Sequence, residues 1–568
     1  MLKLIPRPKH ITISTSWFSL QKDTKIFVEK KYIQEGLFLQ EKLKKITGFN
    51  LNIISKVPDD SQKNIILLKI QKTLPQVLKK EEGYIIKATR NSVSLKAAGD
   101  TGLFYACQSL IDLIEKEDNK WIIPECEIRD WPDFSWRGFM IDPARQFIPV
   151  GIIKQYIDIM AHNKLNILHI HFSDSQSFSI ETKKYPFLNK DTHKDRERGA
   201  YSRKDIKKLV LYAQKHKIEI IPEIDLPGHA THMLKLIPEL QCRVKEGKVS
   251  EWAVCAGSEE TYKFIDRLFG EIAPMFPSRY FHIGTDEIEY RERIPGHPKE
   301  GIISWRKCSN CLERMRKEDI RGVRKLFYYF VNRTEKILKK YGKETMMWND
   351  TIDIGKPHNI PKDTLIHFWR VAAKNRGPRK GCSLSKFLKH GFKVVNSFYP
   401  ETYIRTWVKE ERLLSWHPGK RPPVPVKFRD SVLGGEMCAW GDDRGYEFYE
   451  RVIPSTLALF GDRVWNRGNI KHVQEFRKTL PKHIFGPQLR DELDNLFEVL
   501  GAIIPPLKVG VRANIEGSLK EKTQKEKTRI YHDVEKIIRK ELQKKKVFNL
   551  PYLKEYLKSV CWLREQRD

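Results

Sequence analysis

Eight continuous apolar runs, most of them separated by segments with helical periodicity, constrain the fold of this chain more than any other feature. The runs lie at residues 137–142, 165–172, 218–225, 279–284, 345–350, 364–370, 392–398 and 431–440. Continuous apolar runs are typical of strands that are buried on both faces in a parallel sheet. Eight such strands with crossover helices predict a (β/α)8 TIM barrel. An open doubly wound sheet is the alternative, but its Gly-rich phosphate turn follows none of the runs.

The segments between the runs carry helix signals. Residues 150–164 and 323–341 place apolar side chains at helical spacing, and another helix is expected at about 259–272. Ser202 followed by Asp205 has the form of a capping box, which predicts that a helix begins there. These helices fall where the crossovers of a barrel are needed.

Polar or aromatic side chains follow the carboxyl end of each of the eight runs. They are Asp142, Arg145, His171, Asp174, Asp225, His229, Asp286, Glu287, Trp348, Asp350, Trp369, Tyr399, Glu401, Trp440 and Asp442. Active sites of (β/α)8 barrels lie at this end of the strands. Acids and aromatic rings at the same end of all eight strands therefore predict a binding pocket.

The residue types in this pocket favour a sugar as the ligand. Aromatic rings stack on the C–H faces of sugars, while carboxylates and an arginine make charge-assisted hydrogen bonds to hydroxyl groups. A metal-dependent hydrolase is the alternative, with His171, Asp174 and His229 as candidate ligands. No metal-binding motif stands out among the pocket residues, so neither a metal nor a cofactor is expected.

The adjacent carboxylates Asp286 and Glu287 limit the mechanism. Retaining glycoside hydrolysis ordinarily uses two carboxyl groups about 5–5.5 Å apart that flank the scissile bond. Successive side chains diverge, so this doublet is not expected to straddle a bond. A substrate with a 2-acetamido group would bring its own nucleophile, the amide oxygen. One carboxyl group would then act as the acid, and its neighbour would orient the amide N–H and stabilise the positive charge that develops on it.

The chain on either side of the barrel has a different character. Residues 1–130 contain alternating strand patterns and a helix after Asp100, which predicts a small α/β domain joined to the barrel by the turn-rich segment 126–136. The barrel is expected at 131–475. Residues 476–568 are rich in Lys and Glu and have a helical pattern, which predicts a mostly helical basic extension with a solvated face.

Composition excludes several classes of protein. No uncharged apolar run reaches the roughly 18 residues of a membrane helix. The opening MLKLIPRPKHITIS lacks the apolar stretch of about 7–15 residues found in signal peptides, so a cytoplasmic location is predicted. The net charge of +32 is spread along the chain among 72 acidic residues. We therefore expect a basic solvated surface and no nucleic-acid or membrane partner.

The nine cysteines are scattered along the chain, which is not the pattern of a disulfide framework. Cys308 and Cys311 form one C-x-x-C motif. A structural zinc site usually has four ligands, and no second C-x-x-C or H-x-x-x-H accompanies this motif. We therefore expect two ordinary thiols near a loop.

Five segments carry a resemblance to a known family. They are RGFMIDPARQF (137–147), NKLNILHIHFSDSQSF (163–178), IDLPGH (224–229), HIGTDE (282–287) and GGEMCAWGD (434–442). In this order they resemble the motifs of glycoside hydrolase family 20 β-N-acetylhexosaminidases, over most of residues 1–470. The resemblance implies an exo-acting, retaining, substrate-assisted enzyme that releases terminal non-reducing β-linked N-acetylglucosamine or N-acetylgalactosamine from a glycan. The first 130 residues resemble the small domain that precedes the barrel in this family.

Carried over by position, the resemblance implies a role for each site residue. Glu287 would be the general acid and later base, Asp286 would orient the acetamido group, and Tyr399 would hydrogen-bond its carbonyl oxygen. Asp174 and His229 would form a supporting chain toward Glu287. The implied sugar-binding residues are Arg145 for ring hydroxyls, Trp348, Trp369 and Trp440 for the walls, and Glu401 and Asp442 for the outer hydroxyls.

Some positions depart from the family pattern. Thr285 stands where the family usually has a second Gly, Ile170 replaces a common Trp, and Ser175 replaces a second acid. Glu401 and Asp442 also differ from the common residues, which leaves the choice between gluco and galacto substrates open. No departure removes an expected catalytic group.

Two other functions stay open at this point. A catalytically weak glycan- or polyanion-binding protein on the same scaffold is suggested by Thr285 and the charge of +32. A conventional barrel glycosidase would use a protein carboxylate as nucleophile. The sequence does not specify the oligomeric state.

Overall fold

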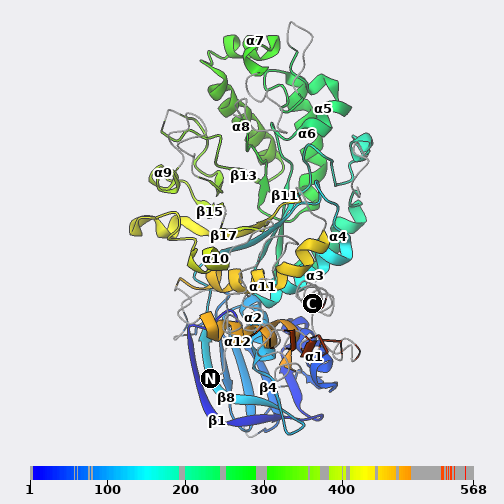
Figure 1. Ribbon diagram of the computed structural model, residues 1–568, viewed down its shortest axis with the longest axis vertical. Helices are drawn as coiled ribbons and strands as arrows, with labels where there is room; N and C mark the ends of the chain where they lie inside the picture. The colour runs from blue at the N-terminus through cyan, green and yellow to red at the C-terminus, as the bar shows by residue number, and fades with distance from the viewer. Residues whose placement is uncertain are drawn as a thin grey trace.

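In the computed structural model, a closed barrel of parallel strands stands beside a smaller, mixed sheet (Figure 1). The structure describes residues 4–487 except 57, 60–61, 75–76, 78–80, 191–198, 244–250, 289–303, 356–357, 371–382, 400, 405–409, 442–445 and 468–472, with scattered positions between 523 and 557. Beyond residue 487, the predicted helical extension therefore falls almost wholly outside the described residues. Within the described part of the chain, no helix combines the length and apolarity needed to cross a bilayer.

The eight apolar runs form the eight strands of the barrel, which confirms the predicted fold class. The strands are β9 (Trp136–Ile141), β10 (Ile167–His171), β11 (Glu219–Glu223), β12 (Tyr280–His282), β13 (Glu344–Trp348), β14 (Leu365–Phe368), β15 (Val394–Asn396) and β17 (Val432–Ala439). The barrel closes because β17 pairs in parallel with both β15 and β9. A two-residue strand, β16 (Tyr403–Ile404), pairs with the carboxyl end of β17.

Helices lie outside the barrel strands and in the connections between them (Figure 1). They are α3 (Val150–His162), α4 (Arg203–Lys215), α5 (Thr231–Leu236), α6 (Glu259–Ile272), α7 (Ser309–Lys317), α8 (Val323–Lys340), α9 (Leu384–Lys389), α10 (Glu410–Ser415) and α11 (Tyr446–Trp465). The capping box predicted at the start of α4 is confirmed, because the Ser202 and Asp205 side chains each bond the other's backbone N–H.

The smaller sheet is formed by residues near the amino terminus. Its strands, in spatial order, are β1 (His10–Leu20), β8 (Lys120–Asp130), β5 (Tyr84–Ala88), β6 (Ser92–Ala97), β4 (Ile65–Ile70), β2 (Lys25–Val28) and β3 (Asn52–Ile54), while β7 (Glu115–Glu117) pairs with β8. The helices α1 (Ile33–Thr47) and α2 (Asp100–Leu113) complete this part of the fold. The expectation that residues 126–136 form a turn-rich connection is wrong for 126–130, which belong to β8 and pair with both β1 and β5. Their alternation of buried and half-buried side chains is that of a strand.

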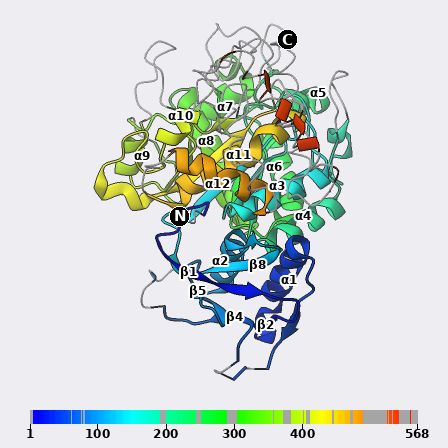
Figure 2. The same cartoon turned by 60° about the horizontal axis from the view of Figure 1, so that its bottom comes forward.

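The helix α12 (Val473–Phe485) lies where the smaller sheet meets the barrel (Figures 1 and 2). Buried polar side chains also join the two parts. His483 of α12 contacts Asp112 at 2.9 Å through Nδ1 and Asn163 at 3.0 Å through Nε2. The Lys164 ammonium, just before β10, donates to Tyr84 at 2.7 Å. These contacts anchor the start of the barrel on the smaller sheet.

The interior of the barrel contains charged groups below the site. Glu223, at the end of β11, accepts from His171 at 2.6 Å and from the Trp348 indole at 2.8 Å, and lies 3.0 Å from His282. All four side chains are essentially inaccessible to solvent. Burial opposes the charge of Glu223, but the surrounding histidines hold its pKa well below its usual range. A buried carboxylate with this many partners fixes the strand ends on which the site is built.

Candidate active site

The Asp286–Glu287 doublet lies on a sharply turning backbone directly after β12. Gly284, Thr285 and Glu287 have φ values of +67°, +82° and +55°. A Cβ atom on Gly284 would lie 1.8 Å from Oδ1 of Asp225, so only glycine fits there. Thr285 donates its backbone N–H to the same oxygen at 3.0 Å. Such left-handed non-glycine residues cost about 1–3 kcal/mol each and are concentrated at functional sites.

His229 stands between the doublet and Asp174. Its Nδ1 lies 3.2 Å from Oδ1 of Asp174, and its Nε2 lies 3.5 Å from Oδ2 of Asp286 and 3.7 Å from Oε2 of Glu287. Burial opposes a charge on the ring, but the carboxylates of Asp174 and Asp286 raise the pKa of His229 to about 9. At neutral pH an imidazolium therefore faces both members of the doublet.

Asp286 is the more buried member of the doublet, with 7% of its surface exposed. Burial raises its pKa to about 6; His229 opposes this rise, and the charges of Asp350 and Glu287 add to it. Burial and the neighbouring Asp286 also raise the pKa of Asp225 well above its usual range. The site therefore holds an anionic Asp286 at neutral pH at an energetic cost.

Arg145 is fixed by two carboxylates from neighbouring strand ends. Its Nη1 lies 2.8 Å from Asp142, and its Nη2 lies 2.7 Å from Oδ2 of Asp174. That oxygen also lies 2.8 Å from Nε2 of His171. Burial disfavours the charged form of Asp174, but Arg145 and His229 hold its pKa well below the usual range. Asp174 is thus an anion that contacts Arg145, His171 and His229 at once.

The same geometry bears on the metal-dependent alternative. His171, Asp174 and Asp225 place their ligand atoms within 4.8 Å of one another, which is close enough to hold a cation. Both oxygens of Asp174 are, however, already engaged by the guanidinium of Arg145 and the imidazolium of His229. A metal ion would have to displace these positive groups, so the local charges favour an organic substrate.

An aromatic cluster lies at the carboxyl ends of the barrel strands. It consists of Met140, Trp348, Trp369, Tyr403, Cys438 and Trp440, with Tyr399 packed against it. Trp369 and Trp440 are 9% and 8% exposed, whereas Trp348 is 1% exposed. The Trp348 ring stacks on His367 at 3.9 Å and its N–H is bonded to Glu223, so it lies beneath the other two indoles. The structure thus brings the three predicted tryptophans together, at different depths.

The remaining predicted residues come from the connections after β15 and β17. Tyr399 is half-buried and donates its backbone N–H to the Trp369 carbonyl at 2.6 Å. Glu401 is 2% exposed, and its Oε1 lies 2.7 Å from Nε of Arg421. Asp442 lies outside the described residues.

Arg370 is a site residue that the sequence analysis did not select. Its Nη2 lies 2.8 Å from Oδ2 of Asp350, and its Nη1 lies 3.7 Å from Oε1 of Glu287. The same Asp350 oxygen accepts the backbone N–H of Glu287 at 3.1 Å, and its partner oxygen accepts the Trp369 indole N–H at 3.2 Å. Arg370 directly follows Trp369 at the end of the sixth apolar run, and this position was the available signal.

Carboxylates, arginines and indoles gathered at the carboxyl ends of barrel strands form a site of the kind that glycoside hydrolases use. The sequence profile described as "Glycosyl hydrolase family 20, catalytic domain" matches residues 134–467. The profile described as "Glycosyl hydrolase family 20, domain 2" matches residues 1–131. The chain therefore belongs to glycosyl hydrolase family 20, as its five motifs indicate.

Relatives named as beta-hexosaminidases match the chain. A beta-hexosaminidase of Porphyromonas gingivalis is 34% identical over 399 residues, which cover 66% of this chain and 49% of that protein. This chain thus spans about half the length of that relative. A beta-hexosaminidase of Vibrio furnissii is 27% identical over 491 residues, with 79% and 75% of the two chains covered.

Solved structures agree with the fold. The beta-N-acetylhexosaminidase of Bacteroides fragilis superposes with a TM-score of 0.71 at 28% identity, covering 87% of this chain and 96% of that one. A chitobiase from Flavobacterium johnsoniae superposes with a TM-score of 0.74 at 24% identity, covering 100% and 92%. The latter similarity supports the fold alone.

Proposed function

We propose that this protein is an exo-acting, retaining β-N-acetylhexosaminidase that hydrolyses terminal β-linked N-acetylglucosamine or N-acetylgalactosamine with the help of the substrate's acetamido group. The observation that carries the proposal is the Asp286–Glu287 doublet at the end of β12, with both carboxylates facing the His229 ring at 3.5 and 3.7 Å. The two groups share one cation and differ in burial, so they are suited to different tasks.

Glu287 is assigned the transfer of a proton to the leaving oxygen. It is the less buried member of the doublet, its backbone N–H is fixed by Asp350, and Arg370 lies 3.7 Å from its carboxylate. After the leaving group departs, the same carboxylate takes a proton from the incoming water. His229 and Asp174 act as positioning residues, because the imidazolium links the doublet to the Arg145-bound carboxylate.

Asp286 is assigned to the acetamido group. As the amide oxygen attacks the anomeric carbon, the amide nitrogen gains positive charge, and a carboxylate hydrogen-bonded to its N–H stabilises that charge. A buried anion is effective here because little water competes with it. Tyr399 would donate to the amide oxygen, and the exposed edges of Trp369 and Trp440 would enclose the methyl group and the sugar ring.

Chromogenic β-glycosides of N-acetylglucosamine, N-acetylgalactosamine and glucose test the proposal. The two acetamido sugars are expected to be cleaved, and the glucoside to be cleaved at least about 100-fold more slowly because it lacks the attacking oxygen. A thiazoline that mimics the cyclised intermediate is expected to inhibit competitively. Equal turnover of the glucoside would contradict substrate assistance.

Variants of the doublet separate the two roles. Glu287→Gln is expected to lower kcat by about 10²–10⁴-fold, and less for substrates whose leaving group needs no proton. Asp286→Asn is expected to lower kcat by a comparable factor for every leaving group, because it removes the anion beside the amide. Glu219→Gln, at the amino-terminal end of β11 and away from the site, is the matched control. It should leave kcat unchanged for both acetamido sugars. A leaving-group dependence in Asp286→Asn but not in Glu287→Gln would reverse the assignment.

A further inference from the structure

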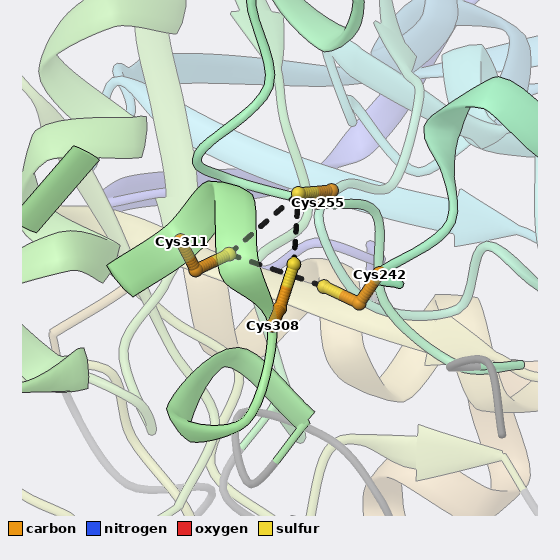
Figure 3. Close-up of side chains that lie close together, drawn as sticks. All are labelled: Cys242, Cys255, Cys308 and Cys311. Atoms are coloured by element: carbon orange, nitrogen blue, oxygen red, sulfur yellow. Dashed lines mark hydrogen bonds between the residues drawn. The ribbon is translucent and has the colours of Figure 1, made fainter. Parts of the chain in front are cut away.

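Four cysteines that are distant in the sequence meet in one buried cluster outside the active site (Figure 3). Cys242 and Cys255 come from the connection between β11 and α6, while Cys308 precedes α7 and Cys311 lies in its first turn. All four side chains are fully buried. Cys242 and Cys311 are 69 positions apart, which is why the C-x-x-C motif gave no sign of the other two.

The spacing of the sulfur atoms is that of a tetrahedral metal site. Sγ of Cys255 lies 3.6 Å from Sγ of both Cys308 and Cys311, and Sγ of Cys242 lies 3.9 Å from Sγ of Cys311. All four sulfur atoms lie within 4.8 Å of one another. Zinc–thiolate bonds of about 2.3 Å at tetrahedral angles place the sulfurs about 3.8 Å apart. The four thiols thus already stand near the corners of a zinc coordination sphere.

The amino-terminal end of a helix lies at the cluster. Cys308 is the N-cap of α7, a nine-residue helix, so the positive end of the helix dipole faces the cluster. Figure 3 shows the four side chains pointing toward a common centre from three separate segments. Thiols are weak hydrogen-bond donors and acceptors, so four of them that converge in the core gain little from bonding one another. A shared cation would bind all four sulfur atoms.

We propose that Cys242, Cys255, Cys308 and Cys311 bind one structural zinc ion. Tetrahedral sites with four sulfur ligands select zinc or iron, and four protein ligands leave no open position for catalysis. Binding releases the four thiol protons to solvent and leaves a formally dianionic centre. The alternative, two disulfides, would require each sulfur to approach one partner to about 2 Å.

The zinc ion would join the two connections that carry the catalytic residues. Trp252, three residues before Cys255, packs against His229 with ring centroids 4.4 Å apart. Trp305, three residues before Cys308, donates its indole N–H to the Val254 carbonyl at 3.0 Å. The ion would thus hold the segment that follows the Asp286–Glu287 doublet against the segment that carries His229.

Metal analysis of the full chain, purified without chelators or an affinity tag that binds metal, tests this site. About one equivalent of zinc per chain is expected, and titration with a mercurial should release it as four thiols react. Replacement of zinc by Co²⁺ should give the visible absorption of tetrahedral cobalt thiolate. Cys242→Ser and Cys311→Ser are expected to lose the zinc, and Cys126→Ser, in β8, should retain it.

The unmodified chain provides a second measurement that does not depend on the variants. If the serine variants fail to fold, the zinc content and thiol count of the unmodified chain still decide the question. A folded chain with less than about 0.1 equivalent of metal after zinc supplementation would overturn the proposal. So would iron in place of zinc, or disulfides that pair the four cysteines. Because none of these measurements uses a sugar substrate, their result is independent of the proposed hydrolase activity.

Discussion

The burial of Asp286 has a measurable consequence for stability, because the residue is charged at a cost. Its pKa is raised from 3.8 to about 6, mainly by burial. The folded protein therefore holds this proton more tightly than the unfolded chain does. The resulting stabilisation is complete below pH about 3.8 and is lost as the pH rises through about 6.

The magnitude follows from the change in pKa. A rise from 3.8 to about 6 corresponds to about 3 kcal/mol at 1.36 kcal/mol per pH unit. Asparagine is nearly isosteric with aspartic acid and stays neutral. Asp286→Asn is therefore expected to match the parent protein in stability near pH 4 and to exceed it by up to about 3 kcal/mol at pH 8.

Urea unfolding followed by tryptophan fluorescence at pH 4.5, 6 and 8 measures this difference. The gain in the free energy of unfolding should increase with pH, while activity falls at every pH. Asp319→Asn, at an exposed position, is the matched control and should show no comparable gain. An Asp286→Asn protein that is no more stable than its parent at pH 8 would refute the argument that burial governs this carboxyl group.

Three further predictions concern activity and the framework of the site. Because only anionic Asp286 can stabilise the amide charge, kcat/KM should rise as the pH increases through about 6. The residual kcat/KM of Asp286→Asn should show no such rise. Glu223→Gln should lower the melting temperature and cost about 3–5 kcal/mol, since buried histidines lose their counter-charge, whereas Glu219→Gln on the same strand should not. Gly284→Ala should abolish activity and destabilise the fold by at least about 2 kcal/mol, measured by thermal melting, because its methyl group meets Asp225.

Much of the architecture was predictable from the sequence because the signals are local. Each barrel strand is a short apolar run with a polar end, and the buried faces of a parallel sheet impose that pattern directly. The doublet, the three tryptophans and Arg145 were found as residues at strand ends, since the barrel brings all such ends to one face. The capping box at Ser202 is also a local signal, and it was read correctly. By contrast, the end of β8 was mistaken for a linker, because its pairing with β1 and β5 depends on distant strands.

The tertiary structure decided what depends on distance between remote residues. The sequence could not reveal that one imidazole faces both Asp286 and Glu287, or that Arg370 stands beside Glu287. It could not show that Trp348 is more buried than the other two indoles, since the burial of a side chain in the barrel depends on the residues that pack around it. The cysteine cluster is the clearest case, because the C-x-x-C motif links only Cys308 and Cys311, and the fold brings Cys242 and Cys255 beside them. Local patterns determine which strands form and which residues end them. Charge coupling and the convergence of the four thiols arise only when the fold brings separate connections within a few ångströms of one another.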